Sequence, residues 1–151
     1  MPTATSSVKI DLSSENKTEE LAVKISKKLK QGDIVFFYGE MGVGKTTFIK
    51  HLIQEFQRVN KFKQIEVTSP TFNLLNEYQI AKTKINHYDL FRLKSNEELK
   101  NLDIFTDRNN SITLIEWPQI IKEKPKNLIE FIFEYGENYE KRFVHIKGLD
   151  L

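Results

Sequence analysis

The stretch GEMGVGKTTF at residues 39–48 constrains the fold of this chain more than any other feature. It satisfies the pattern G-x-x-x-x-G-K-[ST], in which a glycine-rich loop leads from a strand into a helix. The flanking residues fit that context. The run IVFFY at 34–38 is typical of a strand buried on both faces, and apolar side chains recur at helical spacing over residues 45–57. The pattern therefore predicts a phosphate-binding loop and not a chance glycine-rich turn.

Each part of this loop has a mechanical reason to face a phosphate. Glycines permit positive φ and a close approach of backbone amides to an anion. The helix that follows offers its N-terminal amides and the positive end of its dipole. Lys45 is expected to reach the β- and γ-phosphates, and the Thr46 hydroxyl to ligate Mg²⁺. We therefore predict phosphate contacts along the loop and the start of its helix, at Gly39, Glu40, Met41, Gly42, Val43, Gly44, Lys45, Thr46 and Thr47.

The rest of the chain predicts a mixed α/β domain. The expected elements are a helix at 16–31, a hairpin at 72–79 and 84–91, a short helix at 95–102, a strand at 112–117 and a hairpin at 128–135 and 141–147. Asn16 with Glu19, and Ser95 with Glu98, have capping-box spacing, and Gly32 closes the first helix. The sum is an α/β fold: a three-layer, P-loop NTPase-like domain with a short parallel sheet core and antiparallel hairpin additions.

Composition bounds the remaining possibilities. The length of 151 residues predicts a single domain over 1–151, and 39% hydrophobic and 29% charged residues are ordinary for a soluble globular protein. Because the sequence contains no cysteine, it cannot form disulfides, thiolate metal sites or cysteine nucleophiles. No signal-peptide pattern is visible and no stretch reaches the roughly 20 apolar residues of a spanning helix, so we expect a cytoplasmic protein without membrane contact. The net charge of +2 is too weak to argue for nucleic acid by itself.

ATP is the expected nucleotide, mostly by exclusion. A guanine-specific domain would normally carry Asn/Thr-Lys-x-Asp after the loop and Asp-x-x-Gly near the metal, and this chain has neither. Phosphoryl transfer also needs a carboxylate to hold the metal or align the attacking group. Glu116 ends the apolar run at 112–115 in the manner of a Walker B strand, and Asp89 follows the run at 85–88. The alternative for either residue is an exposed acid at the end of a strand.

These residues alone describe a compact P-loop ATP-binding domain and leave open whether it has an acceptor substrate. A small-molecule kinase would usually need an arginine-rich lid, but the arginines at 58, 92, 108 and 142 are scattered in sequence. A nucleotide-dependent assembly module would bind ATP without needing to hydrolyse it. A direct nucleic-acid-binding role would gain little affinity from so weak a net charge.

Several blocks together resemble the TsaE family (also called YjeE), the small bacterial ATPases of tRNA threonylcarbamoyladenosine synthesis. The blocks are GEMGVGKTTF at 39–48, TSPTFNLLNEY at 68–78, HYDLFRL at 87–93, NEELKNL at 96–102 and LIEWP at 114–118. They follow the family order and spacing, whereas the residues after 118 align only loosely. Two departures are mild: the family often has Asp-Leu-Gly-Ala in place of 40–43, and often has glycine in place of Asp103.

The resemblance implies a protein that binds and hydrolyses MgATP, slowly when alone, to drive a cycle in a partner complex. The implied partners are TsaD, which transfers the threonylcarbamoyl group to adenosine 37 of tRNA, and TsaB, its scaffold. The tRNA would be met indirectly, through that complex. Hydrolysis would be a reset or timing step and not a transfer of phosphate to tRNA.

The resemblance also implies roles for the two acids and their surroundings. Thr46 and Glu116 would be Mg²⁺ ligands, directly or through water. Asp89 would lie near the metal and the γ-phosphate, where it would orient the attacking water. Trp117 would lie beside the nucleotide, with a buried core tryptophan as the alternative, and Thr18 would line the base pocket.

A switch-like loop is implied at Ser69, Pro70 and Thr71, whose hydroxyls would sense the γ-phosphate. Without the resemblance, this tripeptide reads as an extended turn, because proline disfavours helix in the residue before it.

Other matching positions carry no assigned chemistry. Glu77, Tyr78 and Arg92 match family positions, and Arg92 could compensate phosphate charge, contact a partner protein or pair with an acid such as Glu77. The histidines lack metal-ligand spacing. His87 and His145 alternate within expected strands, where we expect solvated or hydrogen-bonded imidazoles.

Overall fold

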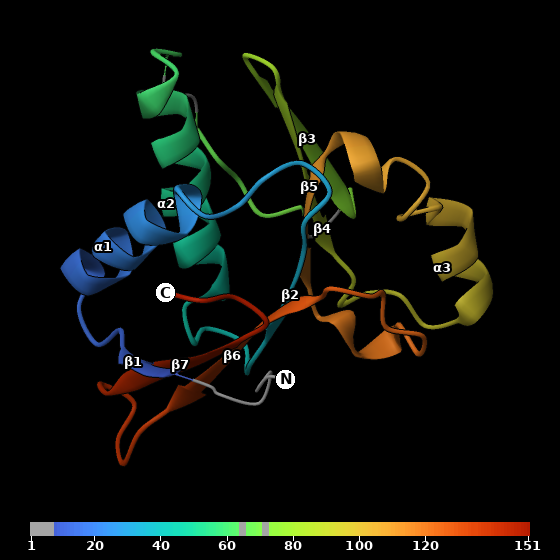
Figure 1. Cartoon of the computed structure of the whole chain (residues 1–151). Coiled ribbons are helices and arrows are strands. Elements are labelled where there is room, and N and C mark those ends of the chain that lie inside the picture. The colour runs from blue at the N-terminus through green and yellow to red at the C-terminus, as the bar shows by residue number, and fades with distance from the viewer. Residues whose placement is uncertain (1–7, 64–65, 71–72) are drawn as a thin grey trace.

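A computed structural model of the chain describes residues 8–63, 66–70 and 73–151. Within them, a seven-stranded sheet has the strand order β1-β7-β6-β2-β5-β4-β3 (Figure 1). The strands are β1 (Val8–Asp11), β2 (Ile34–Tyr38), β3 (Leu75–Ile80), β4 (Thr83–Asp89), β5 (Ile112–Glu116), β6 (Ile129–Tyr135) and β7 (Arg142–Lys147). The helices are α1 (Glu15–Ser26), α2 (Lys45–Val59) and α3 (Asn96–Leu102), with 3₁₀ turns η1 (Arg108–Asn110) and η2 (Pro118–Ile120).

The centre of the sheet is parallel and its two edges are antiparallel. Strand β2 pairs in parallel with both β5 and β6, and β4 pairs in parallel with β5. The hairpin partners β3 and β7 add antiparallel strands, and β1 extends the edge at β7. Helices α1 and α2 lie on one side of the sheet and α3 on the other (Figure 1). The expected three-layer α/β architecture is therefore confirmed.

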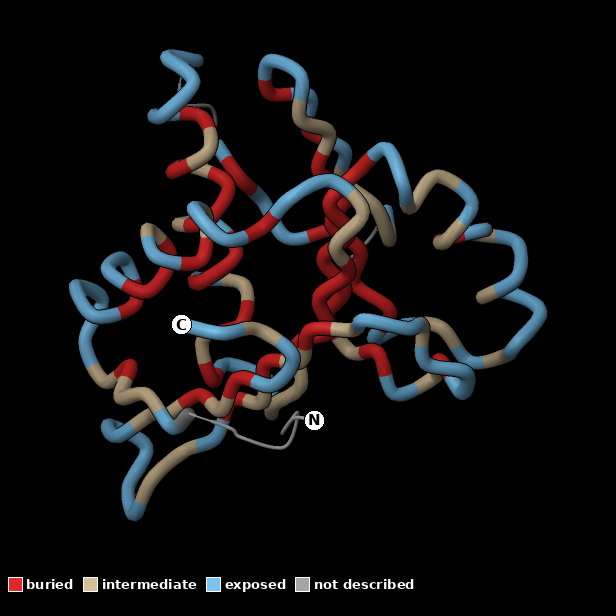
Figure 2. Tube along the Cα trace, viewed as in Figure 1, coloured by how far each residue is buried: buried red, intermediate tan, exposed pale blue. Residues whose placement is uncertain are grey.

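An aromatic cluster fixes α2 against the sheet. Phe48 of α2 packs against Phe131 of β6 at a ring-centroid distance of 5.2 Å and against Phe37 of β2 at 6.1 Å. Phe133 closes the cluster at 6.2 Å from Phe48. Figure 2 shows buried residues gathered along the central strands and the inner sides of α1 and α2. Because α2 begins at Lys45, this packing also sets the position of the glycine loop.

The first helix differs from the expected one at both ends. The prediction of a helix at 16–31 capped by Asn16 was wrong, because Ser14 is the N-cap and its side chain accepts a hydrogen bond from Lys17 N. The helix ends at Ser26, and the amides of Lys28 and Leu29 both donate to Ile25 O. Leu29 is buried all the same, which is why its apolar spacing extended the predicted helix past its true end.

Two further differences come from the edges of the fold. Strand β1 was not predicted, since only its pairing with β7 makes this short N-terminal segment extended. Asp103, in place of the family glycine, ends α3 as its C-cap in the left-handed region at φ 50°. Aspartate tolerates this conformation better than most residues other than glycine.

No helix in the described part of the chain is long and apolar enough to cross a membrane.

Replacing the central phenylalanine of the aromatic cluster tests how α2 is held. Phe48→Ala should lower the free energy of unfolding by about 3–5 kcal/mol, because it removes a fully buried ring from a packed core. Phe62→Ala is the matched control, since Phe62 is 42% exposed and its loss should cost less than about 0.5 kcal/mol. Urea denaturation measures both. Equal effects of the two substitutions would contradict the assigned packing.

Candidate functional site

The glycine loop leaves the end of β2 and enters α2 through backbone that only glycine adopts readily. Gly39, Gly42 and Gly44 have φ of 146°, 82° and 117°. A Cβ atom on Gly39 would also lie 2.9 Å from both Phe133 O and Val43 Cγ1. Gly44 is the N-cap of α2 and Phe48 N donates to its carbonyl, so the amides at the start of α2 remain available to an anion.

The Lys45 side chain is buried beneath this loop. Its ammonium donates a hydrogen bond to Gly39 O and lies 3.7 Å from the centre of the Trp117 ring, a cation–π contact. Burial lowers the pKa of Lys45, whereas the nearby carboxylates of Glu116 and Asp89 act in the opposite direction. The lysine is therefore a desolvated cation whose direct contacts are neutral and whose charge is opposed by two nearby carboxylates, an arrangement suited to a phosphate ligand.

The two predicted acids lie side by side at the ends of parallel strands. Asp89 and Glu116 are register partners in the β4–β5 pair, and both are buried. Thr46 Oγ1 donates to Glu116 Oε1 at 2.8 Å, which joins the start of α2 to the end of β5. The predicted Mg²⁺ residues are thus brought together. Neither acid is the exposed strand end that was the alternative.

Asp89 is the less compensated of the two acids. Its Oδ1 accepts a hydrogen bond from Phe91 N at 3.0 Å. Burial raises the pKa of Asp89 above its ordinary value, and this hydrogen bond opposes that rise. The carboxylate therefore lies beside the loop with capacity for a further donor such as a water molecule.

A buried histidine supports Glu116 from the other side. His87 Nε2 lies 2.7 Å from Glu116 Oε2, and because a carboxylate only accepts, Nε2 is the donor. His87 is fully buried, and its Nδ1 has no hydrogen-bond partner among the described residues. Of the two nitrogens of the expected hydrogen-bonded imidazole, Nε2 therefore has a partner and Nδ1 has none among the described residues. The signal that points to this contact is the two-residue alternation that places His87 and Asp89 on one face of β4.

The residues at this edge fit Mg²⁺ better than a transition metal. No group of three or more His, Cys, Asp or Glu residues that could hold a metal occurs in the described ranges. Thr46, Glu116 and Asp89 instead offer one hydroxyl and two carboxylates. Magnesium prefers oxygen ligands and is usually bound through one or two carboxylates, several waters and substrate phosphates.

Trp117 lies next to the loop and is not a core residue. It is partly exposed, has the left-handed φ of 56°, and contacts the exposed ring of Phe91 at 4.8 Å. Left-handed backbone in a non-glycine residue costs free energy and is concentrated at functional sites. The alternative of a buried core tryptophan was wrong, because the chain turns outward at the end of β5.

Only part of the predicted switch-like loop is described. Thr71 lies outside the described residues, whereas Ser69 is exposed and Pro70 is buried. Pro70 O accepts from Leu74 N, and Leu74 O accepts from Asp89 N at 3.0 Å. The segment after the loop is therefore joined by backbone hydrogen bonds to the strand that carries Asp89.

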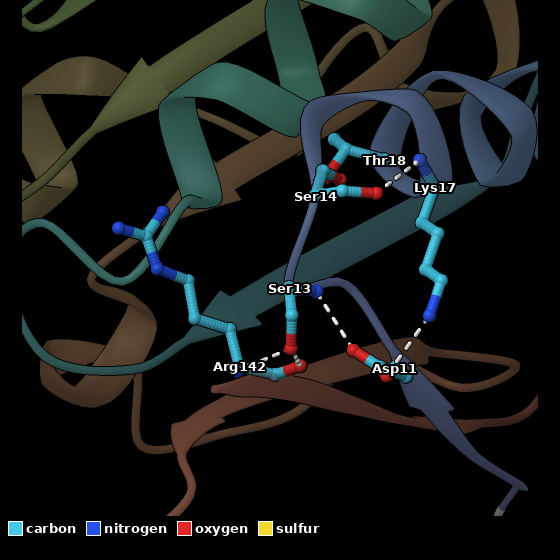
Figure 3. A network of polar contacts seen from close by, with 6 residues as sticks. All are labelled: Asp11, Ser13, Ser14, Lys17, Thr18 and Arg142. Carbon is cyan, nitrogen blue, oxygen red and sulfur yellow. Dashed lines mark hydrogen bonds and ion pairs between the residues drawn. The ribbon is translucent and has the colours of Figure 1, made fainter. Parts of the chain in front are cut away.

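Beside the loop lies a pocket of about 270 Å³. Its walls come from the segment between β1 and α1, from the glycine loop, and from the β6 and β7 strands: Leu12, Ser13, Ser14, Glu15, Thr18, Val43, Gly44, Thr47, Phe133 and Arg142. Thr18, which the resemblance assigns to a base pocket, lines this hollow, and its hydroxyl donates to Ser14 O at 3.3 Å. Figure 3 shows the polar contacts on the segment 11–18 that shape this wall.

The wall is braced by Asp11. This carboxylate accepts from Ser13 N at 2.8 Å and from Lys17 Nζ at 3.0 Å (Figure 3). The hydrogen bonds to Ser13, with a smaller contribution from Lys17, hold the pKa of Asp11 well below its ordinary value. The connection between β1 and α1 is therefore fixed by local contacts.

A larger hollow of about 650 Å³ lies elsewhere, between α3 and the segment after β5. It is lined in part by Leu99, Ile104 and Ile121, and it contains none of the predicted site residues. Glu77, one of the positions left without a role, pairs with Lys84 at 3.3 Å.

Comparisons with known proteins show which family the chain belongs to. A family model described as threonylcarbamoyl adenosine biosynthesis protein TsaE matches residues 12–144. Among curated relatives, a tRNA threonylcarbamoyladenosine biosynthesis protein TsaE of Rickettsia typhi is 40% identical over 90% of this chain and 92% of its own length. One of Rickettsia conorii is 43% identical over 74% of this chain, and the match spans 61% of that relative's length.

A solved structure has the same fold. The crystal structure of YdiB from a Bacillus species superposes with a TM-score of 0.70, covering 94% of this chain and 86% of that one, at 21% sequence identity. This likeness concerns the architecture alone.

Removing the histidine donor tests how Glu116 is held. His87→Leu should lower the free energy of unfolding by about 2–3 kcal/mol, because it leaves a buried carboxylate oxygen without its donor. His145→Leu is the matched control, since His145 pairs with an exposed Glu134 at 2.9 Å. Chemical denaturation compares the two. A smaller loss for His87→Leu than for His145→Leu would contradict the contact.

Proposed function

From the premise that this chain belongs to the TsaE family, we propose that it binds and hydrolyses MgATP in support of tRNA threonylcarbamoyladenosine synthesis. The names of the relatives support the assignment to this pathway. The glycine loop, Lys45 and the two acids at the strand ends support the nucleotide chemistry.

One observation carries the chemical part of the proposal. The Thr46 hydroxyl and the Glu116 carboxylate, 70 positions apart in the chain, meet at 2.8 Å beside the amides of the loop. Thr46 follows the invariant lysine of the phosphate-loop pattern, and Glu116 ends a buried parallel strand. An oxygen-rich metal site next to a phosphate site is the arrangement that nucleotide hydrolysis requires.

The residues then have distinct tasks. The amides of the loop and of the first turn of α2 would hold the phosphates, and Lys45 would exchange Gly39 O for phosphate oxygens. Thr46 and Glu116 would hold the magnesium ion, which would supply charge neutralisation for the β- and γ-phosphates. Asp89 Oδ1 accepts from Phe91 N, and no hydrogen bond from a described residue is made to Oδ2, which would be available to orient an attacking water.

We propose that partner proteins complete this site. By family resemblance these partners are TsaD and TsaB, with tRNA met through their complex. The catalysis depends on positioning, so a switch-like segment at 69–71 that is misplaced in the free protein would keep turnover slow. Ser69 is exposed and so accessible to a docking protein.

Phosphate release from MgATP tests the proposal most directly. We expect slow release by the protein alone and strong stimulation when TsaB and TsaD are added. Glu116→Gln should keep nucleotide binding but lower stimulated turnover by roughly 100-fold, because the metal loses a charged ligand. Glu134→Gln, at an exposed strand position, is the matched control and should behave as the unaltered protein.

The other outcomes separate the rival functions. Bound ATP with no stimulation, and a fully functional Glu116→Gln protein, would indicate a nucleotide-dependent assembly module. Transfer of labelled γ-phosphate to a small acceptor would indicate a kinase. Either result would contradict the proposed partner-completed ATPase.

A further inference from the structure

We propose that Arg142 is the residue that recognises the nucleoside of the bound nucleotide, with its planar guanidinium stacked on the base. The inference rests on the proposed function, because it concerns the pocket beside the phosphate loop. Arg142 begins β7, almost one hundred residues after the glycine loop, and no pattern in the sequence connects the two.

The backbone of Arg142 is held from both sides by the segment before α1. Its N–H donates to Ser13 Oγ at 3.1 Å, and its carbonyl accepts from Leu12 N at 2.8 Å. Figure 3 shows the side chain leaving this clamp and pointing toward the start of α2. The backbone contacts thus fix the point from which the side chain starts.

The guanidinium itself makes no hydrogen bond or ion pair with the residues that the structure describes, and it ends beside the loop. Its Nη1 lies 4.0 Å from where a Cβ atom on Gly44 would be, so it borders both the loop and the 270 Å³ pocket. The pocket acid Glu15 is engaged by His51 Nε2 at 3.2 Å. An arginine with a fixed backbone and an uncommitted charged plane is available to a ligand.

The chemistry of the pocket selects the nucleoside over the phosphates. Leu12, Val43 and Phe133 supply apolar surface, and the Thr47 hydroxyl supplies a polar contact for a sugar or a base edge. Nucleic-acid bases stack on aromatic rings and on the guanidinium planes of arginine. Because Thr47 belongs to the first turn of α2, the pocket starts where the phosphate chain would end.

Comparing ATP with inorganic tripolyphosphate isolates this contribution. Both ligands offer the same phosphate chain, and only ATP carries a nucleoside. Calorimetric titration with each ligand in the presence of Mg²⁺ should show that Arg142→Met weakens ATP binding by roughly tenfold and leaves tripolyphosphate binding unchanged. Arg142→Lys should restore little, because lysine keeps the charge but lacks the plane.

The control variant is Lys147→Met, which removes a positive charge from the opposite, exposed end of β7 and should alter neither affinity. Thermal unfolding without ligand confirms that each variant folds. Equal ATP affinity in Arg142→Met and Lys147→Met would overturn the proposal. So would a parallel loss of both ligands, or full rescue by lysine, since each indicates a charge contact with phosphate.

Failure of the proposed function gives a different pattern. If the unaltered protein binds neither ligand, the phosphate site itself is wrong and the Arg142 assignment falls with it. If it binds tripolyphosphate as tightly as ATP, the phosphate site stands and the nucleoside assignment alone is overturned.

Discussion

The hydrogen bond between Thr46 and Glu116 joins the two halves on which the site depends. Thr46 is fixed because α2 packs through Phe48 onto β2 and β6, and Glu116 is fixed because β5 lies between β2 and β4. His87 holds the second oxygen of the same carboxylate. The hydrogen bonds Thr46–Glu116–His87 therefore run from the glycine loop into the buried sheet, and a shift of either half would separate the oxygens that we propose bind the metal.

The packing of α2 against the sheet also buries the Lys45 ammonium, which is energetically unfavourable. A buried ammonium is unfavourable without compensation, and burial lowers the pKa of Lys45 accordingly. Its direct contacts, Gly39 O and the ring of Trp117, are neutral, and the carboxylates of Glu116 and Asp89 offset only part of the effect of burial on its pKa. The raised pKa of Asp89 has the same cause. The proposed ligand, which carries phosphates and a divalent cation, would stabilise both buried charges together.

The sequence predicts those parts of the structure that local patterns encode. The apolar runs at 34–38 and 112–115 are buried strands, and the loop between β2 and α2 could be predicted because each of its glycines has a mechanical reason. The C-terminal end of α1 could not be predicted, because Leu29 is buried at a helical spacing from Ile25 although it lies beyond the helix. Arg142 lies beside the loop because β7 pairs with β6, so its position could not be predicted from local sequence.

The central claim is that phosphates engage Lys45 beside Thr46 and Glu116, and the single tryptophan of the chain reports on it. The measurement is Trp117 fluorescence during titration with MgATP, because the Lys45 ammonium lies 3.7 Å from the centre of that ring. We expect a saturable change in emission that Lys45→Met abolishes. Unchanged emission while calorimetry shows ATP to be bound would contradict it, since the ligand would then bind without displacing Lys45.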